Sequence, residues 1–285
     1  MSIKFGPSGN SLSFYDQGLK HSYQMPAWLS DMGLSAYEYQ CSKGCRIKTE
    51  TAEKIGEEAK KHNIALSIHA PYYINLSSEG EKRDKSVGYI LETLNVARLM
   101  GATRIVVHSG GCATMSREEA MALAKETLKC AINEADNAGF SDIHICPETM
   151  GKINQLGTIE EVVDFCLLDE RLIPTIDFGH LNARTFGGVN SAEDYAAILD
   201  EVKNRLGSER EKIFHSHFSK IEYTEKGGEK KHLTFDDTVF GPDFEPLAEL
   251  ICRRGLTPTI ICESDGTMAE DALAMKKMYE QKLKG

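Results

Sequence analysis

The feature that most constrains the fold is a short, mostly apolar, strand-forming run that recurs along the chain and is followed each time by a helical segment. Eight such runs are found, at residues 3–6, 36–39, 64–69, 104–108, 142–148, 171–177, 212–217 and 259–263. The predicted helices lie at residues 26–32, 51–62, 85–100, 116–138, 158–168, 191–206, 246–254 and 267–283. Apolar strands that alternate with amphipathic helices indicate a parallel sheet covered by helices. Eight such units predict an α/β fold of the (β/α)8 type, a TIM barrel, rather than an open doubly wound sheet.

Length and composition fit one barrel of this kind. The chain has 285 residues, 41% of them hydrophobic, and no low-complexity linker interrupts it, so we expect a single domain over residues 1–285. No apolar run reaches membrane-spanning length, and the first residues do not resemble a signal peptide. The eight cysteines are scattered, which favours reduced thiols and a cytoplasmic protein over a disulfide framework.

Charge and short motifs narrow the function. The formal net charge of −10 argues weakly against a general nucleic-acid binder, whose surface is usually basic. Bound divalent cations can nevertheless invert the local field at the place where a nucleic-acid backbone lies. The fingerprints of phosphate-binding loops and of dinucleotide-binding folds are both absent from the sequence.

Residues with metal-binding side chains gather at the C-terminal ends of the predicted strands. In a barrel these ends meet at one mouth, where active sites lie. The third to eighth strands each carry a histidine or a carboxylate there: His69, His108, Glu148, Asp177, His215 and Glu263. We expect His180 in a loop after a turn at Gly179, and His232 in the loop after the seventh strand. His217 has the same parity as His215 and is interpreted as a supporting partner rather than a ligand.

These side chains indicate which ions the mouth would hold. Imidazoles with carboxylates and no thiolate favour zinc, with manganese or iron as alternatives. The ligands are too many for one tetrahedral ion, so we expect two or three, with Glu148 able to bridge a pair. Two ions about 3.5–4 Å apart can clamp the attacking and leaving oxygens of a phosphoryl displacement, with a metal-bound hydroxide as nucleophile.

The residues at the mouth resemble those of the endonuclease IV family, the metal-dependent apurinic/apyrimidinic endonucleases. The resemblance spans roughly residues 1–270 and is carried by His69-Ala70-Pro71-Tyr72-Tyr73-Ile74-Asn75-Leu76, His108-Ser109-Gly110, Pro147-Glu148-Thr149, Asp177-Phe178-Gly179-His180, His215-Ser216-His217-Phe218 and Cys262-Glu263-Ser264. It implies a TIM barrel with three zinc ions that hydrolyses the phosphodiester 5′ to an abasic site. The expected partner is damaged double-stranded DNA, with no membrane and no obligate protein partner.

The resemblance also assigns the ligands to ions. It implies that His69 and His108 hold a first ion, which Glu148 bridges to a second. Asp177, His215 and Glu263 would complete the second site, and His180 and His232 would hold the third. Glu148 and Glu263 are the residues expected to be catalytic.

One position departs from the family pattern. The family has an aspartate two residues before the last histidine, where this chain has Lys230, and a protonated lysine cannot ligate. Three interpretations remain open: the third ion is weak or absent, Glu229 takes the role, or Lys230 contacts a phosphate. We expect Lys230 to point away from the ion and toward bound DNA. The other expected DNA contacts are Tyr72, Gln40, Lys43 and Arg46.

A second function fits part of the same pattern. Metal-dependent sugar isomerases and epimerases on this barrel resemble the chain in Glu148, Asp177, His215 and Glu263, which hold one divalent ion in those enzymes. They do not need the remaining histidines, which are His69, His108, His180 and His232. These four residues favour the endonuclease.

Overall fold

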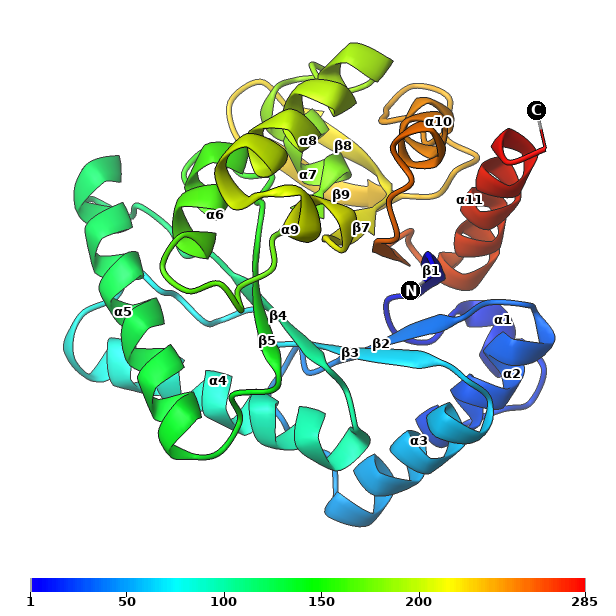
Figure 1. The fold of residues 1–285 in the computed structure, drawn as a ribbon, viewed down its shortest axis with the longest axis horizontal. Coiled ribbons are helices and arrows are strands. Elements are labelled where there is room, and N and C mark those ends of the chain that lie inside the picture. Colours follow the sequence, from blue (N-terminus) through cyan, green and yellow to red (C-terminus); the bar gives the residue numbers. More distant parts are fainter. Residues whose placement is uncertain (1, 285) are drawn as a thin grey trace.

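Eight parallel strands form the centre of the molecule, and helices surround them (Figure 1). The computed structural model describes residues 2–284. The strand order is β1-β10-β7-β6-β5-β4-β3-β2. The strands are β1 (Lys4–Pro7), β2 (Ala36–Gln40), β3 (Ala65–His69), β4 (Arg104–His108), β5 (His144–Glu148), β6 (Thr175–Asp177), β7 (His215–Phe218) and β10 (Thr259–Cys262).

The sheet closes where β1 meets β2. Ser8 and Glu38 form a parallel bridge there, and the amide of Gly9 donates to the carbonyl of Glu38 at 2.9 Å. A Cβ atom on Gly6 would lie 1.8 Å from the carbonyl oxygen of Ala36, so only glycine allows this approach. The predicted TIM barrel is therefore confirmed as a nearly closed barrel.

The outer layer consists of the helices that follow the strands. They are α1 (Leu12–Asp16), α2 (Met25–Asp31), α3 (Thr49–Lys61), α4 (Gly80–Met100), α5 (Arg117–Asn137), α6 (Ile159–Cys166), α7 (Phe178–Arg184), α8 (Ala192–Leu206), α9 (Ser208–Lys212), α10 (Glu245–Arg254) and α11 (Met268–Lys282), with a 3-10 turn at Ser22–Gln24. Helix α5 begins at a capping box in which Ser116 Oγ accepts from the Glu119 amide at 3.2 Å and Glu119 accepts from the Ser116 amide at 2.9 Å. Such caps satisfy amides that the first helical turn leaves unpaired.

Two elements near the seventh strand differ from the sequence prediction. The expected loop around His180 is helix α7, which begins directly after β6 because Asp177 caps it. The segment after β7 is an antiparallel hairpin of β8 (Lys220–Thr224) and β9 (Gly228–Leu233). A Cβ atom on Gly179 would lie 2.5 Å from the carbonyl oxygen of Ser219, so this glycine lets α7 pack close to the chain that leads into the hairpin.

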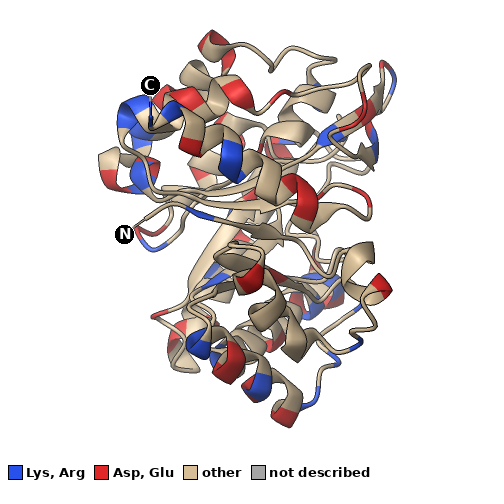
Figure 2. Ribbon diagram, turned by 90° about the vertical axis from the view of Figure 1, so that its right-hand side faces the viewer, with Lys and Arg blue, Asp and Glu red and all other residues tan. Residues whose placement is uncertain are grey.

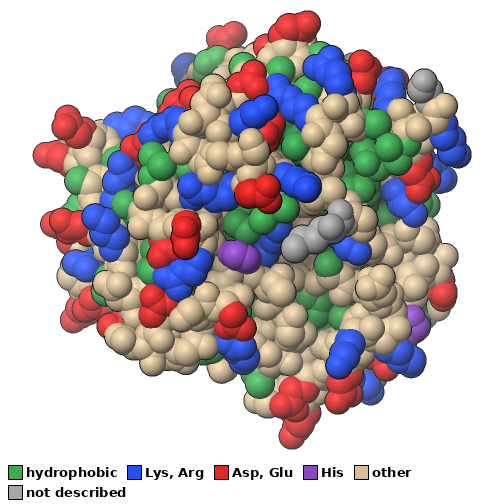
Figure 3. All heavy atoms as spheres, viewed as in Figure 1, with side chains coloured by type: hydrophobic (Ala, Val, Ile, Leu, Met, Phe, Trp, Pro, Cys, Tyr) green, Lys and Arg blue, Asp and Glu red, His purple; other side chains and the backbone are tan. Residues whose placement is uncertain are grey.

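The two faces of the strands have different cores. Outward side chains such as Ile68, Ile176 and Phe214 join the helices in one continuous apolar cluster. The inside of the barrel holds a small separate cluster of Val106, Cys146 and Ile173. Polar groups line the rest of the interior: Glu38, Ser67, Thr175, His215 and His217 are all buried. Charged residues concentrate on the outer helices and loops (Figure 2), and both signs are interspersed over the face seen in Figure 3.

No helix within residues 2–284 combines the length and the apolar character that crossing a membrane requires.

Candidate metal centre

The first donor group joins three neighbouring strands at the mouth. His69 ends β3, His108 ends β4 and Glu148 ends β5, and their donor atoms lie within 4.8 Å of one another. Glu148 Oε2 is 3.5 Å from His69 Nε2 and 3.4 Å from His108 Nε2. These distances exceed those of good N–H···O hydrogen bonds. The three side chains therefore converge on one place at the mouth.

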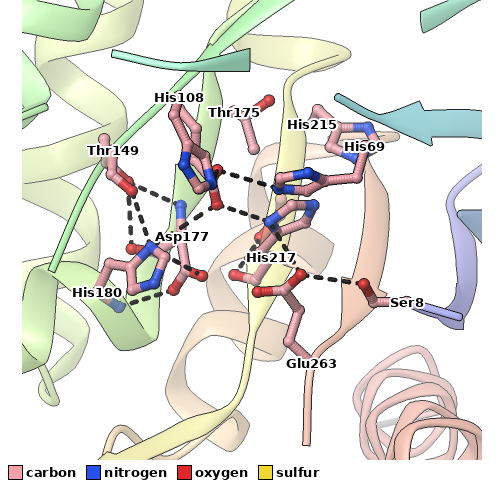
Figure 4. Close-up of polar contacts among 12 residues, drawn as sticks. Ser8, His69, His108, Thr149, Thr175, Asp177, His180, His215, His217 and Glu263 are labelled. Carbon is pink, nitrogen blue, oxygen red and sulfur yellow. Dashed lines mark hydrogen bonds and ion pairs between the residues drawn. The ribbon is translucent and has the colours of Figure 1, made fainter. Parts of the chain in front are cut away.

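The second donor group contains His217 in the place that the sequence analysis gave to His215. Its four members are Glu148, Asp177, His217 and Glu263. His217 Nδ1 lies 2.8 Å from Glu148 Oε1 and 3.6 Å from Glu263 Oε1. Figure 4 shows His217 directed toward Glu263, with His215 set apart from them.

The structure places His215 deeper in the barrel than the sequence analysis did, although it points inward as expected. Both histidines of β7 point into the barrel, but β7 continues to Phe218, so His217 is the last inward residue. In the sheet register His217 pairs with Asp177, whereas His215 pairs with Thr175, one layer lower. His215 Nε2 lies 3.0 Å from Glu38 Oε2, and His215 belongs to a deeper donor group with Glu38 and His217 rather than to the group with Asp177 and Glu263.

The third donor group lies between α7 and β9. It consists of His180, Glu229 and His232, and His180 Nε2 is 3.5 Å from Glu229 Oε2. The register explains how Glu229 reaches this place: Glu222 pairs with Lys231 and Tyr223 pairs with Glu229, which leaves Lys230 as an extra residue in β9. Such a bulge re-aims side chains and turns Glu229 and His232 to the same side.

Lys230 does not belong to this group. Its side chain is exposed and forms an ion pair with Glu222 on the neighbouring strand. Of the three interpretations left open by the sequence, the geometry favours Glu229 as the replacement for the family's aspartate. Because Lys230 is the extra residue at the bulge and pairs with Glu222, its ammonium group does not lie among these donor atoms.

Three histidines hold a fixed ring orientation. Nδ1 of His69 lies 2.8 Å from the carbonyl of Ala70, and Nδ1 of His180 lies 2.9 Å from the carbonyl of Thr149. A carbonyl can only accept, so each ring carries its proton on Nδ1 and presents Nε2 to the mouth. His232 Nδ1 makes a similar contact, 2.8 Å from Ser219 Oγ. Outer contacts of this kind are usual for histidines that bind metals.

Buried charge dominates the electrostatics of the mouth. Burial opposes the charged form of His69, but its contact with Glu148 outweighs burial and raises the pKa to about 9. Burial lowers the pKa of His108 to about 4. Burial disfavours the His180 cation as well, yet Asp177 and Glu229 raise its pKa to about 9. Protons and metal ions would therefore compete for the same donors.

Two donor oxygens lack hydrogen bonds within the described part of the chain, although histidine nitrogens lie 3.2 Å from Asp177 Oδ2 and 3.4 and 3.5 Å from Glu148 Oε2. Glu148 Oε2 and Asp177 Oδ2 are buried, and among residues 2–284 neither has a hydrogen-bond partner. Buried carboxylate oxygens without partners are costly, and a bound ion is one of the few things that satisfies them. His69, His217 and Glu263 also form a group of their own within 4.8 Å. The ligand types and their overlap fit more than one divalent ion.

The remaining predicted residues lie around the rim. Gln40 donates to Ser8, whose hydroxyl donates to Glu263 Oε1 at 3.0 Å. Tyr72 is 59% exposed in the loop after β3, and its amide donates to the carbonyl of Ser42 in the loop after β2 at 3.4 Å. Lys43 and Arg46 lie in that neighbouring loop. Beside the donors lies a cavity of about 440 Å³, lined by Ser8, Gln40, Lys231, His232, Glu263, Ser264, Asp265, Gly266 and Met268.

Sequence relatives divide between an uncharacterized protein and endonucleases. An uncharacterized protein of Methanocaldococcus jannaschii is 31% identical over 278 residues, which are 97% of each chain. A probable endonuclease 4 of Shouchella clausii is 29% identical over 188 residues, or 61% of this chain and 62% of that one. This second match spans less than two thirds of the relative. The predicted resemblance to endonuclease IV is therefore confirmed as a similarity of sequence over part of the chain.

Solved structures share the barrel. A D-tagatose 3-epimerase-like protein superposes with a TM-score of 0.72 and 20% identity, over 99% of this chain and 97% of that one. Endonuclease IV of Thermus thermophilus superposes with a TM-score of 0.67 and 19% identity, over 100% of this chain and 99% of that one. A model of the xylose isomerase-like TIM barrel family matches residues 26–280. Because that match covers most of the sequence, the chain belongs to the xylose isomerase-like TIM barrel family.

Proposed function

We propose that the protein is a metal-dependent DNA-repair endonuclease that hydrolyses the phosphodiester 5′ to abasic sites. The observation that carries the proposal is the group of His180, Glu229 and His232, which adjoins the two donor groups on the strands. A single-ion sugar enzyme has no use for this third group. Phosphodiester hydrolysis does, because charge develops on several oxygens at once.

The donor groups suggest how the ions would be shared. His69 and His108 would hold a first ion with Glu148, and Asp177, His217 and Glu263 would hold a second, to which Glu148 also reaches. His180, Glu229 and His232 would hold a third. Zinc suits this set of imidazoles and carboxylates, with manganese as the alternative. Ions bound there would lower the pKa of a water and neutralise phosphate charge.

The chain's own residues would orient the phosphodiester within this centre. Ser8 fixes Glu263 by donating to its Oε1, and Gln40 in turn fixes Ser8. We propose Glu148 and Glu263 as the catalytic carboxylates, because each lies within 4 Å of His217 and each belongs to two of the donor groups.

The rim offers contacts for an opened DNA backbone. The exposed ring of Tyr72 provides a stacking surface, and stacking on aromatic side chains is tolerant of base identity. Lys43 and Arg46 on the neighbouring loop, and Lys230 on the hairpin, supply cations for phosphates. Contacts of this kind position a duplex without reading its sequence.

The test is a nicking assay on a labelled duplex with one abasic site, with zinc or manganese supplied. We expect one cut 5′ to the lesion, leaving a 3′-hydroxyl, and an intact control duplex that stays largely uncut. Prior removal of the metal with a chelator should abolish cutting, and re-addition should restore it. Absence of nicking by protein that has bound its ions would refute the proposal.

A sugar epimerase remains the second candidate because of the cavity beside the donors. Its volume of about 440 Å³ lies in the range of small-molecule sites, about 300–1,000 Å³. The quartet of Glu148, Asp177, His217 and Glu263 also matches a one-ion sugar site. Epimerisation of a ketose by a preparation that leaves the abasic duplex uncut would favour this function.

A further inference from the structure

A buried carboxylate below the mouth has no role in the functions considered above. Glu38 lies on β2, points into the barrel and is 0% exposed. Ser67 Oγ donates to its Oε2 at 2.8 Å, and His215 Nε2 lies 3.0 Å from the same oxygen. The other oxygen, Oε1, lies 2.8 Å from His217 Nε2. Within residues 2–284 neither Oε1 nor His217 Nε2 has a hydrogen-bond partner, so these two buried atoms meet as a close ion-pair contact. With His215, the two residues also form a group of donor atoms that lie within 4.8 Å of one another.

His217 differs from the other histidines of the mouth in the nitrogen that it presents. His69 and His180 donate through Nδ1 to carbonyls and turn Nε2 toward the donor groups. His217 does the reverse: its Nδ1 lies 2.8 Å from Glu148 Oε1, and its Nε2 faces down to Glu38. A side chain from another strand thus takes the place that a main-chain carbonyl has at the other two rings.

We propose that Glu38 is a positioning residue of the metal centre, which holds the proton of His217 on Nε2 and thereby presents Nδ1 as a ligand beside Glu148, Asp177 and Glu263. The inference rests on the metal centre of the proposed function, but not on its substrate.

Ser67 and His215 complete the support from the opposite side. They anchor Oε2, so the carboxylate plane of Glu38 cannot turn away from His217. A metal-bound histidine that donates its other N–H to a carboxylate is a better ligand, and loss of such a partner typically lowers metal affinity about 10- to 100-fold. His215, which the sequence suggested as a ligand, would then act two steps from the ion.

The experiment measures metal binding without any nucleic acid. Zinc and cobalt affinities are determined by competition with a chromogenic chelator for wild type, Glu38→Gln, Glu38→Ala and Ser67→Ala. The matched control is Glu211→Gln, which alters another buried carboxylate, 2.8 Å from Arg254 and outside all donor groups. The cobalt absorption spectrum reports which ligand set has changed.

We expect Glu38→Gln to weaken one class of ion by about 10- to 100-fold and to leave the other ions unchanged. Glu38→Ala should weaken it further and Ser67→Ala less, while Glu211→Gln should match wild type. Equal affinities in folded wild type and Glu38→Gln would overturn the role of Glu38, as would an equal loss in Glu211→Gln. A wild type that binds no ions would instead refute the metal centre, so the two failures are distinguishable.

Discussion

The barrel strands and the β8–β9 hairpin both deliver side chains to the mouth, but by different means. On the strands, alternate residues point inward, and the last inward residue of each strand meets its neighbours at the same level. On the hairpin, the extra residue Lys230 shifts the alternation by one, so that Glu229 and His232 face the same way. The strand donors are therefore held by the whole barrel, and the hairpin donors by one local irregularity.

This difference indicates which donors tolerate change. A strand donor is fixed by hydrogen bonds to two neighbouring strands, so its position is insensitive to single substitutions nearby. The hairpin is a separate two-stranded sheet, which a few main-chain contacts tie to the loop after β5, among them the Glu229 amide to the Gly151 carbonyl at 3.1 Å. Two-stranded ribbons are marginal by themselves. We therefore expect the third donor group to bind its ion more weakly than the strand groups, and the predictions below test this contrast.

The largest effect should come from Glu148, a carboxylate that belongs to two strand groups. Glu148→Gln removes a negative charge that two donor groups share. We expect nicking activity to fall by more than about 100-fold, which is the upper end of the loss typical when a residue that only supports a metal ligand is changed. Circular dichroism and thermal unfolding should show that the barrel still folds. Turnover near that of wild type would contradict a shared role for Glu148.

Acidity should weaken strand and hairpin groups alike. His69 and His180 have pKa values of about 9 in the metal-free protein, so below that pH a proton must leave before either ring can ligate. Affinity for zinc should then rise with pH up to about 9, by about tenfold per unit for each proton displaced. Chelator competition between about pH 6 and 9 measures this. If zinc affinity changed with pH in one group and not in the other, the strand donors and the hairpin donors would differ in how protons compete with the ion.

A matched pair of histidine variants tests which histidine of β7 belongs to the second donor group. His217→Gln should lose one ion or weaken it by about tenfold or more, because this ring belongs to the second donor group. His215→Gln should keep every ion and show a smaller loss of affinity, since His215 acts only through Glu38. Elemental analysis of both proteins decides the matter. The reverse order of effects would restore His215 as the ligand.

The smallest effects should come from the hairpin. Glu229→Gln should lower the affinity of the weakest ion by about tenfold and spare the others. Lys230→Ala is the control: its exposed ion pair with Glu222 is worth at most about 1 kcal/mol, so zinc binding should hardly change. If Lys230→Ala strengthened the third site as much as Glu229→Gln weakened it, the lysine would lie near the ion after all.

Much of the fold and of the strand donors can be predicted from sequence, since strand ends in a barrel meet at one mouth. His69, His108, Glu148, Asp177 and Glu263 follow from that rule alone. His215 takes the place of His217 in the prediction because alternation gives the direction of a side chain and not its depth. The sequence does not predict a role for Glu38, because nothing in Ala36-Tyr37-Glu38-Tyr39 shows that its histidine partners lie on β7. The bulge at Lys230 depends on pairing with β8, which one strand's sequence does not contain.

Asp177 serves two purposes with its two oxygens. Its Oδ1 accepts from the His180 amide at 2.7 Å and starts α7, a contact worth about 1 kcal/mol, while its Oδ2 is left for the second donor group. His180, in the first turn of that helix, serves the third group. One short helix therefore joins the second and third donor groups, with its cap in one and its first turn in the other. The same dual use restricts which residues this position can accept: asparagine keeps the cap but loses the charge, and glutamate keeps the charge but caps poorly.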